Sequence, residues 1–354
     1  MAKVTVVIVN WNGAEDTINC IGSLQRMATG GSDLSIVVTD NASSDDSFAT
    51  LKAFVKGQGY RSTSLELPAE QAGRISEVAA YVSDDALRPT ITLAAAVENG
   101  GFAAGNNIGV ELGRAVGTPE YFWFLNSDTE VDSGALSFLL DKMARHPDIG
   151  MCGSTLVHAS DRTTVQAYGG ARYSMRTGRA WSAGEGQPYS EAASDEWAEQ
   201  RINYVSGAAM LVRAELLTQV GLMSEDYFLY NEEIDLSCRS AGKFRLGVAT
   251  KSIVYHRVGA SIGTEGSTQA ASRLSTFYQT RSKLLFAARH SRRFYPLVWL
   301  TLFARAVKFF RRPSRRAEAK VILGVLAGRR KVDQRWFSER RREASSPGQL
   351  EASR

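Results

Sequence analysis

The fold class follows from one segment, Tyr121-Phe122-Trp123-Phe124-Leu125-Asn126-Ser127-Asp128-Thr129-Glu130-Val131-Asp132, in which an apolar run gives way to acids. The run from Tyr121 to Leu125 has the length and composition of a strand that is buried on both faces of a parallel sheet. In open α/β sheets, ligands bind beyond the carboxyl ends of the strands. We therefore expect Asp128 to lie at the rim of a ligand site.

Two interpretations of the acids remain open. In the first, Asp128 binds a divalent cation. In the second, the acids serve structure only, and Asp132 or Ser133 caps a helix whose apolar residues recur at helical spacing until Pro147. The two are compatible, because Asp128 lies four residues before the cap and is not explained by it.

The composition is that of a folded protein with room for one large or two ordinary domains, since 44% of its 354 residues are hydrophobic. Three cysteines, Cys20, Cys152 and Cys238, form no C-x-x-C pair, which favours a reduced, cytosolic compartment. The apolar run from Val4 ends at Asn10, too soon for the core of a signal peptide, so we expect no secretion signal.

The charge is divided along the chain. Residues 1–272 carry 21 Lys and Arg against 32 Asp and Glu, whereas residues 273–342 carry 20 against 3. An acidic body with a strongly basic C-terminal segment indicates that this segment faces a polyanion, either nucleic acid or an anionic membrane surface.

The N-terminal part alternates strands and helices. Residues 3–10 and 34–41 are typical of buried strands, and the helices between them have apolar faces. Short connections in this β-α-β-α order predict a parallel sheet wound in the right-handed sense. Asp40, at a strand end, suits recognition of a base N–H or a ribose hydroxyl, and equally suits a turn or cap.

A glycine-rich turn follows the third predicted strand, residues 91–97. Glycines within residues 99–109 permit positive φ and close approach of the backbone to a ligand, and the following helix offers free N–H groups to an anion. The spacing is not that of a G-x-G-x-x-G dinucleotide fingerprint. Before it, residues 66–86 are polar and acid-rich, and we expect a loop-plus-helix insertion there.

Two later segments carry candidate site residues. Residues 159–203 form a long polar section with five aromatic residues, which we assign to acceptor binding, although packing of the aromatics against the core explains them as well. Glu232, Glu233 and Asp235 open a helix, where the macrodipole favours acids. The apolar approach before them would bury the carboxylates and raise a pKa toward the range of a general base. His256 ends another strand and, taken alone, is more typical of a structural residue.

The basic segment contains two predicted helices. Arg281 falls in the apolar stripe of the first, where a guanidinium either extends to solvent or meets an anion such as a diphosphate. The second has an apolar run over residues 295–304, well short of the ~20 residues that span a bilayer. Leu, Trp and Phe flanked by Lys and Arg favour a helix in the membrane interface over nucleic-acid binding. Residues 343–354 are expected to be disordered.

Five motifs, in this order, resemble the family 2 glycosyltransferases, and within that family look most like bacterial rhamnosyltransferases and galactofuranosyltransferases. They are Val6-Val7-Ile8-Val9-Asn10-Trp11-Asn12, Thr39-Asp40-Asn41-Ala42-Ser43-Ser44-Asp45, Gly101-Phe102-Ala103-Ala104-Gly105-Asn106-Asn107, Asn126-Ser127-Asp128 and Phe228-Leu229-Tyr230-Asn231-Glu232-Glu233-Ile234-Asp235. The resemblance covers residues 4–290.

The resemblance implies a GT-A fold, an α/β doubly wound, mostly parallel sheet followed by amphipathic helices. The catalytic domain would be residues 1–272, with a nucleotide-binding half (1–132) and an acceptor half (133–272). Residues 273–342 would associate with the membrane. The donor would be a nucleotide-diphosphate sugar, bound by Asn10, Asp40, Asn99, Gly101, Gly105, Asn106, Asn126 and Arg281.

The resemblance also implies roles for the acids and a metal. Asp128 would be the metal-bearing acid of a D-x-D motif, and His256 matches a metal-binding histidine of related enzymes. Glu233 would deprotonate the acceptor hydroxyl, with Glu232 and Asp235 orienting the acceptor or Glu233. Asn126 stands where the first acid of D-x-D is usual, and Glu233 where Asp is commoner, so the choice of base among the three acids stays open. Such ligands suit Mg²⁺ or Mn²⁺, and the histidine favours Mn²⁺.

Taken together, we predict an inverting glycosyltransferase at the cytoplasmic face of the cell membrane. It would move a sugar, such as rhamnose from dTDP-rhamnose, to a glycan or lipid-linked acceptor in cell-envelope synthesis, with no nucleic-acid partner. The alternatives are a polyprenyl-phosphate glycosyl synthase, which needs no hydroxyl base, and a sugar-nucleotide-binding scaffold without turnover.

Overall fold

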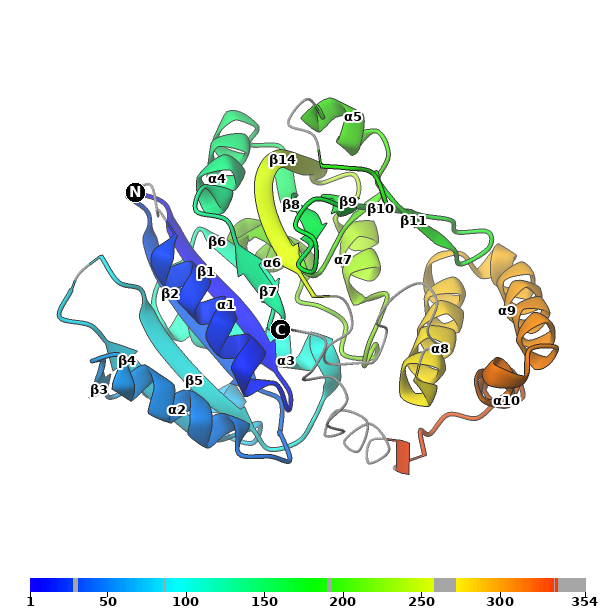
Figure 1. The fold of residues 1–354 in the computed structure, drawn as a ribbon, viewed down its shortest axis with the longest axis horizontal. Helices are drawn as coiled ribbons and strands as arrows, with labels where there is room; N and C mark the ends of the chain where they lie inside the picture. Colours follow the sequence, from blue (N-terminus) through cyan, green and yellow to red (C-terminus); the bar gives the residue numbers. More distant parts are fainter. Residues whose placement is uncertain (28–30, 86, 190–192, 258–271, 334, 337–354) are drawn as a thin grey trace. The chain divides into compact units, whose positions relative to one another are not determined.

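The computed structural model describes residues 1–27, 31–85, 87–189, 193–257, 272–333 and 335–336. The chain divides into two compact units. The first consists of Met1–Tyr173 and Arg179–Arg257, and the second of Ser174–Gly178 and Val258–Arg354. Figure 1 shows the ribbon coloured along the sequence.

The first unit is built on one large sheet with the strand order β3-β4-β5-β2-β1-β6-β13-β8-β14-β7, and β9 pairs with β8 at its side. Its N-terminal strands are β1 (Lys3–Asn10), β2 (Asp33–Asp40), β3 (Arg61–Thr63), β4 (Ile75–Val82), β5 (Thr90–Ala96), β6 (Tyr121–Asn126) and β7 (Thr129–Val131). The later ones are β8 (Ile149–His158), β9 (Val165–Tyr168), β13 (Ala209–Arg213) and β14 (Arg245–His256). The GT-A fold class predicted from the sequence agrees with this mostly parallel sheet.

Strand direction decides where the site lies. β1 pairs in parallel with β2 and β6, and β2 with β5. β13 is antiparallel to both β6 and β8, and β14 is parallel to β8. Consequently β1, β2, β5, β6, β8 and β14 all end at the same edge of the sheet. Asn10, Asp40, Asn126 and His256 are the last residues of four of these strands.

Helices cover both faces of the sheet because successive side chains of each strand point to opposite faces. Val4, Val6 and Ile8 of β1 pack into one core cluster with residues of α1 (Ala14–Arg26), α2 (Ser47–Gly57) and α4 (Ala135–Arg145). Val7 packs on the other face with residues of α3 (Gly101–Val116), α6 (Ala214–Val220) and α7 (Glu232–Ser240).

The segment predicted as a loop-plus-helix insertion, residues 66–86, is different in the structure. It contains a short 3₁₀ turn, Ala69–Gln71, and then β4, which pairs antiparallel with β5 and with the edge strand β3. The acids that indicated a helix face solvent; Glu77, for example, pairs with Lys52 at the surface. Pairing with β5 supplies backbone hydrogen bonds that local composition does not reveal.

The long polar section, residues 159–203, is also more ordered than expected. Besides β9 it contains β10 (Gly170–Tyr173), β11 (Ala180–Ser182) and α5 (Asp195–Glu199), and β10 pairs with β11 and β12 (Tyr204–Val205) in a small second sheet. Tyr168 and Tyr173 are buried, whereas Trp181 is 49% exposed. Core packing therefore explains the two tyrosines, and Trp181 stays available for a ligand.

The second unit contains three helices, α8 (Arg273–His290), α9 (Tyr295–Phe310) and α10 (Arg316–Leu326), with short 3₁₀ turns at Arg292–Phe294 and Pro313–Arg315. Both helices expected in the basic segment are thus present. Within the described part of the chain, no helix is long and apolar enough to cross a membrane. Residues 343–354, expected to be disordered, lie outside the described residues.

Candidate active site

The turns after β1 and β2 are joined by a dense hydrogen-bond network around Asp40. Asn10 Nδ2 donates to Asp40 Oδ2 over 2.6 Å, and both residues are buried. The backbone N–H of Ser43 donates to Oδ1 over 2.9 Å, and its hydroxyl donates to Oδ2 over 2.7 Å. A carboxylate has about four lone-pair positions, so three are used inside the turn. The structural interpretation of Asp40 therefore holds, and one position on Oδ1 is left for a ligand.

Asn41, which the sequence analysis did not single out, connects the next two motifs. Its Nδ2 donates to Gly101 O and to Asn99 Oδ1, each over 3.0 Å. Gly101 has φ +84°, and a Cβ placed there would lie 2.1 Å from Phe228 O. Only glycine fits this close approach. Asn99 and Gly101 thus fix the start of α3 against the segment that precedes the acids of α7.

Two predicted donor-binding residues are instead used in packing. A Cβ on Gly105 would lie 2.7 Å from Val9 of β1, and Gly109 and Gly113 approach Val7 and Thr5 of that strand in the same way. This glycine stripe lets α3 lie directly on β1. Asn106 is buried and its Nδ2 donates to Phe102 O over 2.9 Å, within the helix. Gly105 and Asn106 are therefore withdrawn as ligand contacts.

His256 lies beside Asp128 at the end of β14. Its Nε2 is 3.3 Å from Asp128 Oδ1 and 3.2 Å from Asn126 Nδ2. On the other side of the ring, Gln166 Nε2 donates to the His256 carbonyl over 2.6 Å, which orients the amide so that Gln166 Oε1 lies 2.8 Å from Nδ1. The Nδ1 therefore carries a hydrogen, and Nε2 presents either a lone pair or a second proton toward Asp128.

This arrangement requires positive charge between two groups. An Nε2 lone pair and a carboxylate oxygen at 3.3 Å repel each other unless a proton or a cation lies between them. Carboxylate oxygen and imidazole nitrogen are a donor set that suits Mn²⁺. Asn126 turns its Nδ2 toward the ring, so the carbonyl-ligand role expected for it would need the amide to rotate. No cluster of three or more His, Cys, Asp or Glu suited to a metal occurs among the residues described.

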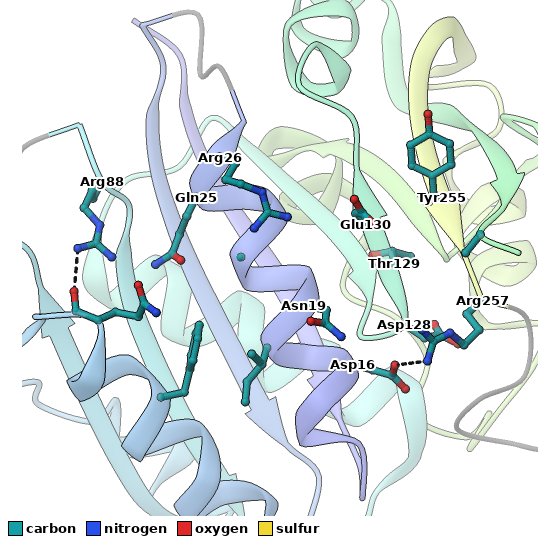
Figure 2. Close-up of a pocket in the computed structure, with 15 residues that line it drawn as sticks. Asp16, Asn19, Gln25, Arg26, Arg88, Asp128, Thr129, Glu130, Tyr255 and Arg257 are labelled. Atoms are coloured by element: carbon teal, nitrogen blue, oxygen red, sulfur yellow. Dashed lines mark hydrogen bonds and ion pairs between the residues drawn. The ribbon is translucent and has the colours of Figure 1, made fainter. Parts of the chain in front are cut away.

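A cavity of about 560 Å³ opens beside Asp128, between α1 and β7. Figure 2 shows Arg257 reaching Asp16 of α1 across its end, and their ion pair measures 2.9 Å. The backbone N–H of Arg257 also donates to Asp128 O over 3.0 Å. Burial raises the pKa of Asp16, and the Arg257 guanidinium opposes that rise. Neither residue was found from the sequence, because each stands outside the recognisable motifs.

The helix α7 begins with two buried carboxylates. Tyr230 and Asn231 precede it with φ of 68° and 75°, an uncommon left-handed pair that turns the chain sharply into the helix. Glu232 Oε2 and Glu233 Oε2 are buried, and neither has a hydrogen-bond partner in the part of the chain described. Burial raises the pKa of Glu233 to about 7. Burial and the charge of Glu233 raise the pKa of Glu232 well above its ordinary value.

Asp235 differs from these two acids. Arg239, one helical turn later, donates from Nε to Asp235 Oδ2 over 2.7 Å. The same guanidinium donates to Val220 O over 2.5 Å and to Leu222 O over 2.7 Å. Asp235 therefore orients an arginine that holds the loop after α6, and the structure gives it a scaffold role in place of the expected acceptor-orienting role.

Contacts along β6 and β13 bring the two groups of acids to one edge. The backbone N–H of Asn126 donates to Ala208 O over 3.0 Å. A Cβ on the adjacent Gly207 would lie 3.8 Å from Glu233 Cβ. Glu233 is thus close to the end of β6, the strand that leads into Asp128. Arg281 lies in α8 of the other unit, so its predicted contact with a donor remains a prediction.

Comparisons with known proteins bear on these sites. No family model matches the chain. Over 177 residues the chain is 28% identical to N-acetylglucosaminyl-diphospho-decaprenol L-rhamnosyltransferase of Mycobacterium tuberculosis, in the sequences of two strains. The match covers 47% of this chain and 54% of that relative, so the chain spans about half the length of the curated relatives it matches.

Solved structures share the fold. The mannosyltransferase PcManGT of Pyrobaculum calidifontis, determined with GDP-Man and Mn²⁺, has 13% identity and a TM-score of 0.50, over 96% of this chain and 79% of that one. TarS of S. aureus gives 11% and 0.50, over 95% and 50%. GalNAc-T7, determined with UDP, GalNAc and Mn²⁺, gives 12% and 0.53, over 73% and 44%. The expected GT-A fold and the resemblance to glycosyltransferases, rhamnosyltransferases among them, are confirmed.

Proposed function

We propose that this chain is a metal-dependent, inverting glycosyltransferase of cell-envelope synthesis. Its donor is a nucleotide-diphosphate sugar, with dTDP-rhamnose the first candidate, and its acceptor is a lipid-linked glycan or a polysaccharide. Support comes from the motifs in the sequence, from the GT-A fold and from similarity to a curated decaprenol-linked rhamnosyltransferase.

One observation carries the proposal. A carboxylate beside an imidazole nitrogen, Asp128 with His256, shares a sheet edge with two buried carboxyl groups that lack hydrogen-bond partners among the described residues. The first pair suits the charged end of a donor. The second pair has the raised pKa of a base that works near neutral pH. Transfer of a sugar from a diphosphate to a hydroxyl needs both.

In the proposed reaction, Glu233 accepts the proton of the acceptor hydroxyl. The hydroxyl oxygen forms a bond to the anomeric carbon on the side opposite the diphosphate, the bond from that carbon to the diphosphate oxygen breaks, and the configuration inverts. Glu232 lies beside Glu233 and raises the affinity of the pair for one proton, because two adjacent buried carboxylates do not both ionise readily.

The donor half of the proposed site is the edge formed by β1, β2 and β6. Asp40 offers its remaining Oδ1 position to the base or ribose, and Asn10 holds Asp40 in place. Asn99 and Gly101 shape the turn before α3. Asp128 and His256 would hold Mn²⁺ or Mg²⁺, and a cation bound there would supply charge neutralisation on the departing diphosphate. Gln166 keeps the Nε2 of His256 directed toward Asp128.

A peripheral location at the cytoplasmic face of the cell membrane completes the proposal. A lipid-linked acceptor is presented at a membrane surface, and the basic residues 273–342 provide attraction to anionic lipid at on the order of 1 kcal/mol each near the surface. The proposal includes no nucleic-acid partner.

The test measures donor binding and turnover separately. Thermal unfolding with dTDP-rhamnose and Mn²⁺ is expected to raise Tm, because a ligand that binds only the folded state stabilises it. Asp128→Asn should remove the Mn²⁺-dependent part of that rise, whereas Asp132→Asn, at a helix start four residues on, should keep it. Release of nucleoside diphosphate should require both Mn²⁺ and an acceptor lipid, and the product should have the inverted anomeric configuration.

Two outcomes would replace this function by another. Tm shifts with sugar nucleotides, but no diphosphate release with any acceptor extract, would indicate a binding scaffold. Transfer to a polyprenyl phosphate at full rate by Glu233→Gln would indicate a polyprenyl-phosphate glycosyl synthase, because a phosphate acceptor needs no hydroxyl base. No Tm shift with any sugar nucleotide would remove the proposal altogether.

A further inference from the structure

The second unit has its own apolar core, and α9 contributes one face to it. Val298, Leu302, Ala306 and Phe309 of α9 are buried. They pack with Ala287 of α8 and with residues of α10 in a separate core cluster. The spacing of these four residues is that of one side of a helix. The opposite side of α9 is therefore not needed to hold the unit together.

That opposite side is apolar as well. Five large side chains on it are exposed: Leu297 (43%), Leu300 (54%), Phe303 (41%), Val307 (38%) and Phe310 (49%). Steps of three, three, four and three residues place them along one stripe of the helix. We call this stripe the outer face of α9. Scattered exposed hydrophobics are ordinary, but a contiguous stripe of this kind marks a surface that binds something.

Cations surround the outer face. Between residues 291 and 333 the chain carries 12 Lys and Arg but only 2 acids, Glu318 and Asp333. Glu318 is buried and bound by Arg315 through two hydrogen bonds of 2.8 and 2.7 Å, and Asp333 pairs with Arg335 over 2.7 Å. The exposed cations closest in sequence are Arg292, Arg293, Lys308, Arg311, Arg312 and Arg316. The acids are already engaged, so the surface around the stripe is positive.

We propose that the outer face of α9 lies in the interface of an anionic lipid bilayer, with the helix axis along the membrane plane. The five apolar side chains enter the region between headgroups and acyl chains, and the flanking Lys and Arg contact the headgroup phosphates. This inference rests on the proposed function only for its biological sense, since a lipid-linked acceptor is met at such a surface. It names which face of which helix makes the contact.

The charge pattern favours lipid over the other occupants. A second copy of the chain docked on the same face would bring two cationic rims together, which opposes association. Nucleic acid would pair with the cations but would leave Leu297, Leu300 and Val307 without an apolar partner. A bilayer interface satisfies both parts at once. Sixteen residues of α9 measure about 24 Å at 1.5 Å per residue, so the helix covers the surface without crossing it.

The experiment uses the full chain and vesicle flotation. Neutral phosphatidylcholine vesicles are compared with vesicles that contain 30% phosphatidylglycerol, a content that is about one lipid in three and makes the surface anionic. Flotation with the anionic vesicles is expected, and it should weaken as salt is raised. Leu300→Ser/Phe303→Ser, which removes apolar area without adding charge, should weaken partitioning about ten-fold or more.

Two controls separate this from unfolding and from general stickiness. Phe138→Ser removes an aromatic residue of similar exposure, 39%, from α4 of the first unit and should float like the parent chain. Tm of the double variant should equal that of the parent, because both changed side chains are exposed. Lys308→Gln/Arg311→Gln/Arg312→Gln should lose the preference for anionic vesicles while keeping the outer face.

Equal flotation of Leu300→Ser/Phe303→Ser and the parent would overturn the inference. So would loss of self-association by this variant without vesicles, which would make α9 a dimer surface, or loss of oligonucleotide binding with flotation unchanged. Failure of the proposed function is distinguishable, because a chain that transfers no sugar to a water-soluble acceptor can still float through α9. Transfer to that acceptor with no flotation would leave the function standing and remove the membrane surface.

Discussion

Asp128 and Glu232 are both buried or nearly buried acids at one edge of the sheet, yet their surroundings are opposite. Asp128 follows β6 and faces an imidazole nitrogen at 3.3 Å, where positive charge belongs. Glu232 opens α7 beside another carboxyl group, and its Oε2 has no hydrogen-bond partner within the described residues. The same functional group is thus prepared to hold a cation in one place and a proton in the other.

Asp235 provides the internal reference for this comparison. It is on the same helix as Glu232 and Glu233 and is as deeply buried as Glu232, but Arg239 binds it. Burial alone therefore does not set the behaviour of a carboxylate here. The presence or absence of a cationic partner decides whether the group serves structure or stays free for chemistry.

The largest expected effect comes from Glu233→Gln. Removing the proposed base should lower kcat by about 10²–10⁴-fold, while Mn²⁺-dependent donor binding, measured by Tm shift, stays unchanged. Glu196→Gln, an exposed acid in the same unit, is the matched control and should keep full kcat. Full activity of Glu233→Gln with a hydroxyl acceptor would move the base to another residue.

Asp235→Ala should cost stability instead of catalytic rate. It leaves the Arg239 guanidinium without its carboxylate, and breaking such a pair lowers the free energy of unfolding by about 3–5 kcal/mol. Glu111→Ala breaks the exposed i,i+3 pair with Arg114 and should cost at most about 1 kcal/mol. Urea unfolding of both variants measures the difference, and equal costs would contradict the scaffold role of Asp235.

The pH dependence of stability should follow the Glu232–Glu233 pair. Both groups bind a proton more tightly in the folded than in the unfolded protein, so their contribution is fully present below pH 4.5 and is lost as pH rises through about 7. The loss is up to about 3 kcal/mol at 1.36 kcal/mol per pKa unit. Glu232→Gln/Glu233→Gln should flatten this slope in urea unfolding between pH 4.5 and 7.5. An unchanged slope would mean that the carboxylates are solvated.

Gln166→Leu gives the smallest expected effect. The change removes the acceptor for the Nδ1–H of His256, so the ring no longer keeps Nε2 toward Asp128. Loss of such an orienting partner typically weakens metal affinity by about 10–100-fold. Mn²⁺ titration followed by Tm measures this, and Gln166→Glu, which keeps an acceptor oxygen, should restore most of the affinity. If Leu and Glu variants bind Mn²⁺ equally well, Gln166 does not position His256.

Much of the framework was predictable. The runs around β1, β2 and β6 are apolar over the whole strand length because both faces of a parallel sheet are buried, and α1 to α4 show helical periodicity. Segments whose partners come from elsewhere in the chain were predicted less well. β4 looked like an acidic helix because only β5, its neighbour in space, makes it a strand. Gly105 looked like a ligand-binding glycine until its packing on Val9 was seen.

The amino-acid sequence by itself determined the α/β class, the order of the motifs, and the presence of acids after β6 and at the start of α7. These features depend on side-chain periodicity and composition, which are local. Only the tertiary structure decided that His256 meets Asp128, that Gln166 orients it, and that Arg239 binds Asp235 while Glu232 and Glu233 keep unpaired carboxylate oxygens. Those facts depend on strand direction and on contacts across many residues of chain, and no local pattern carries that information.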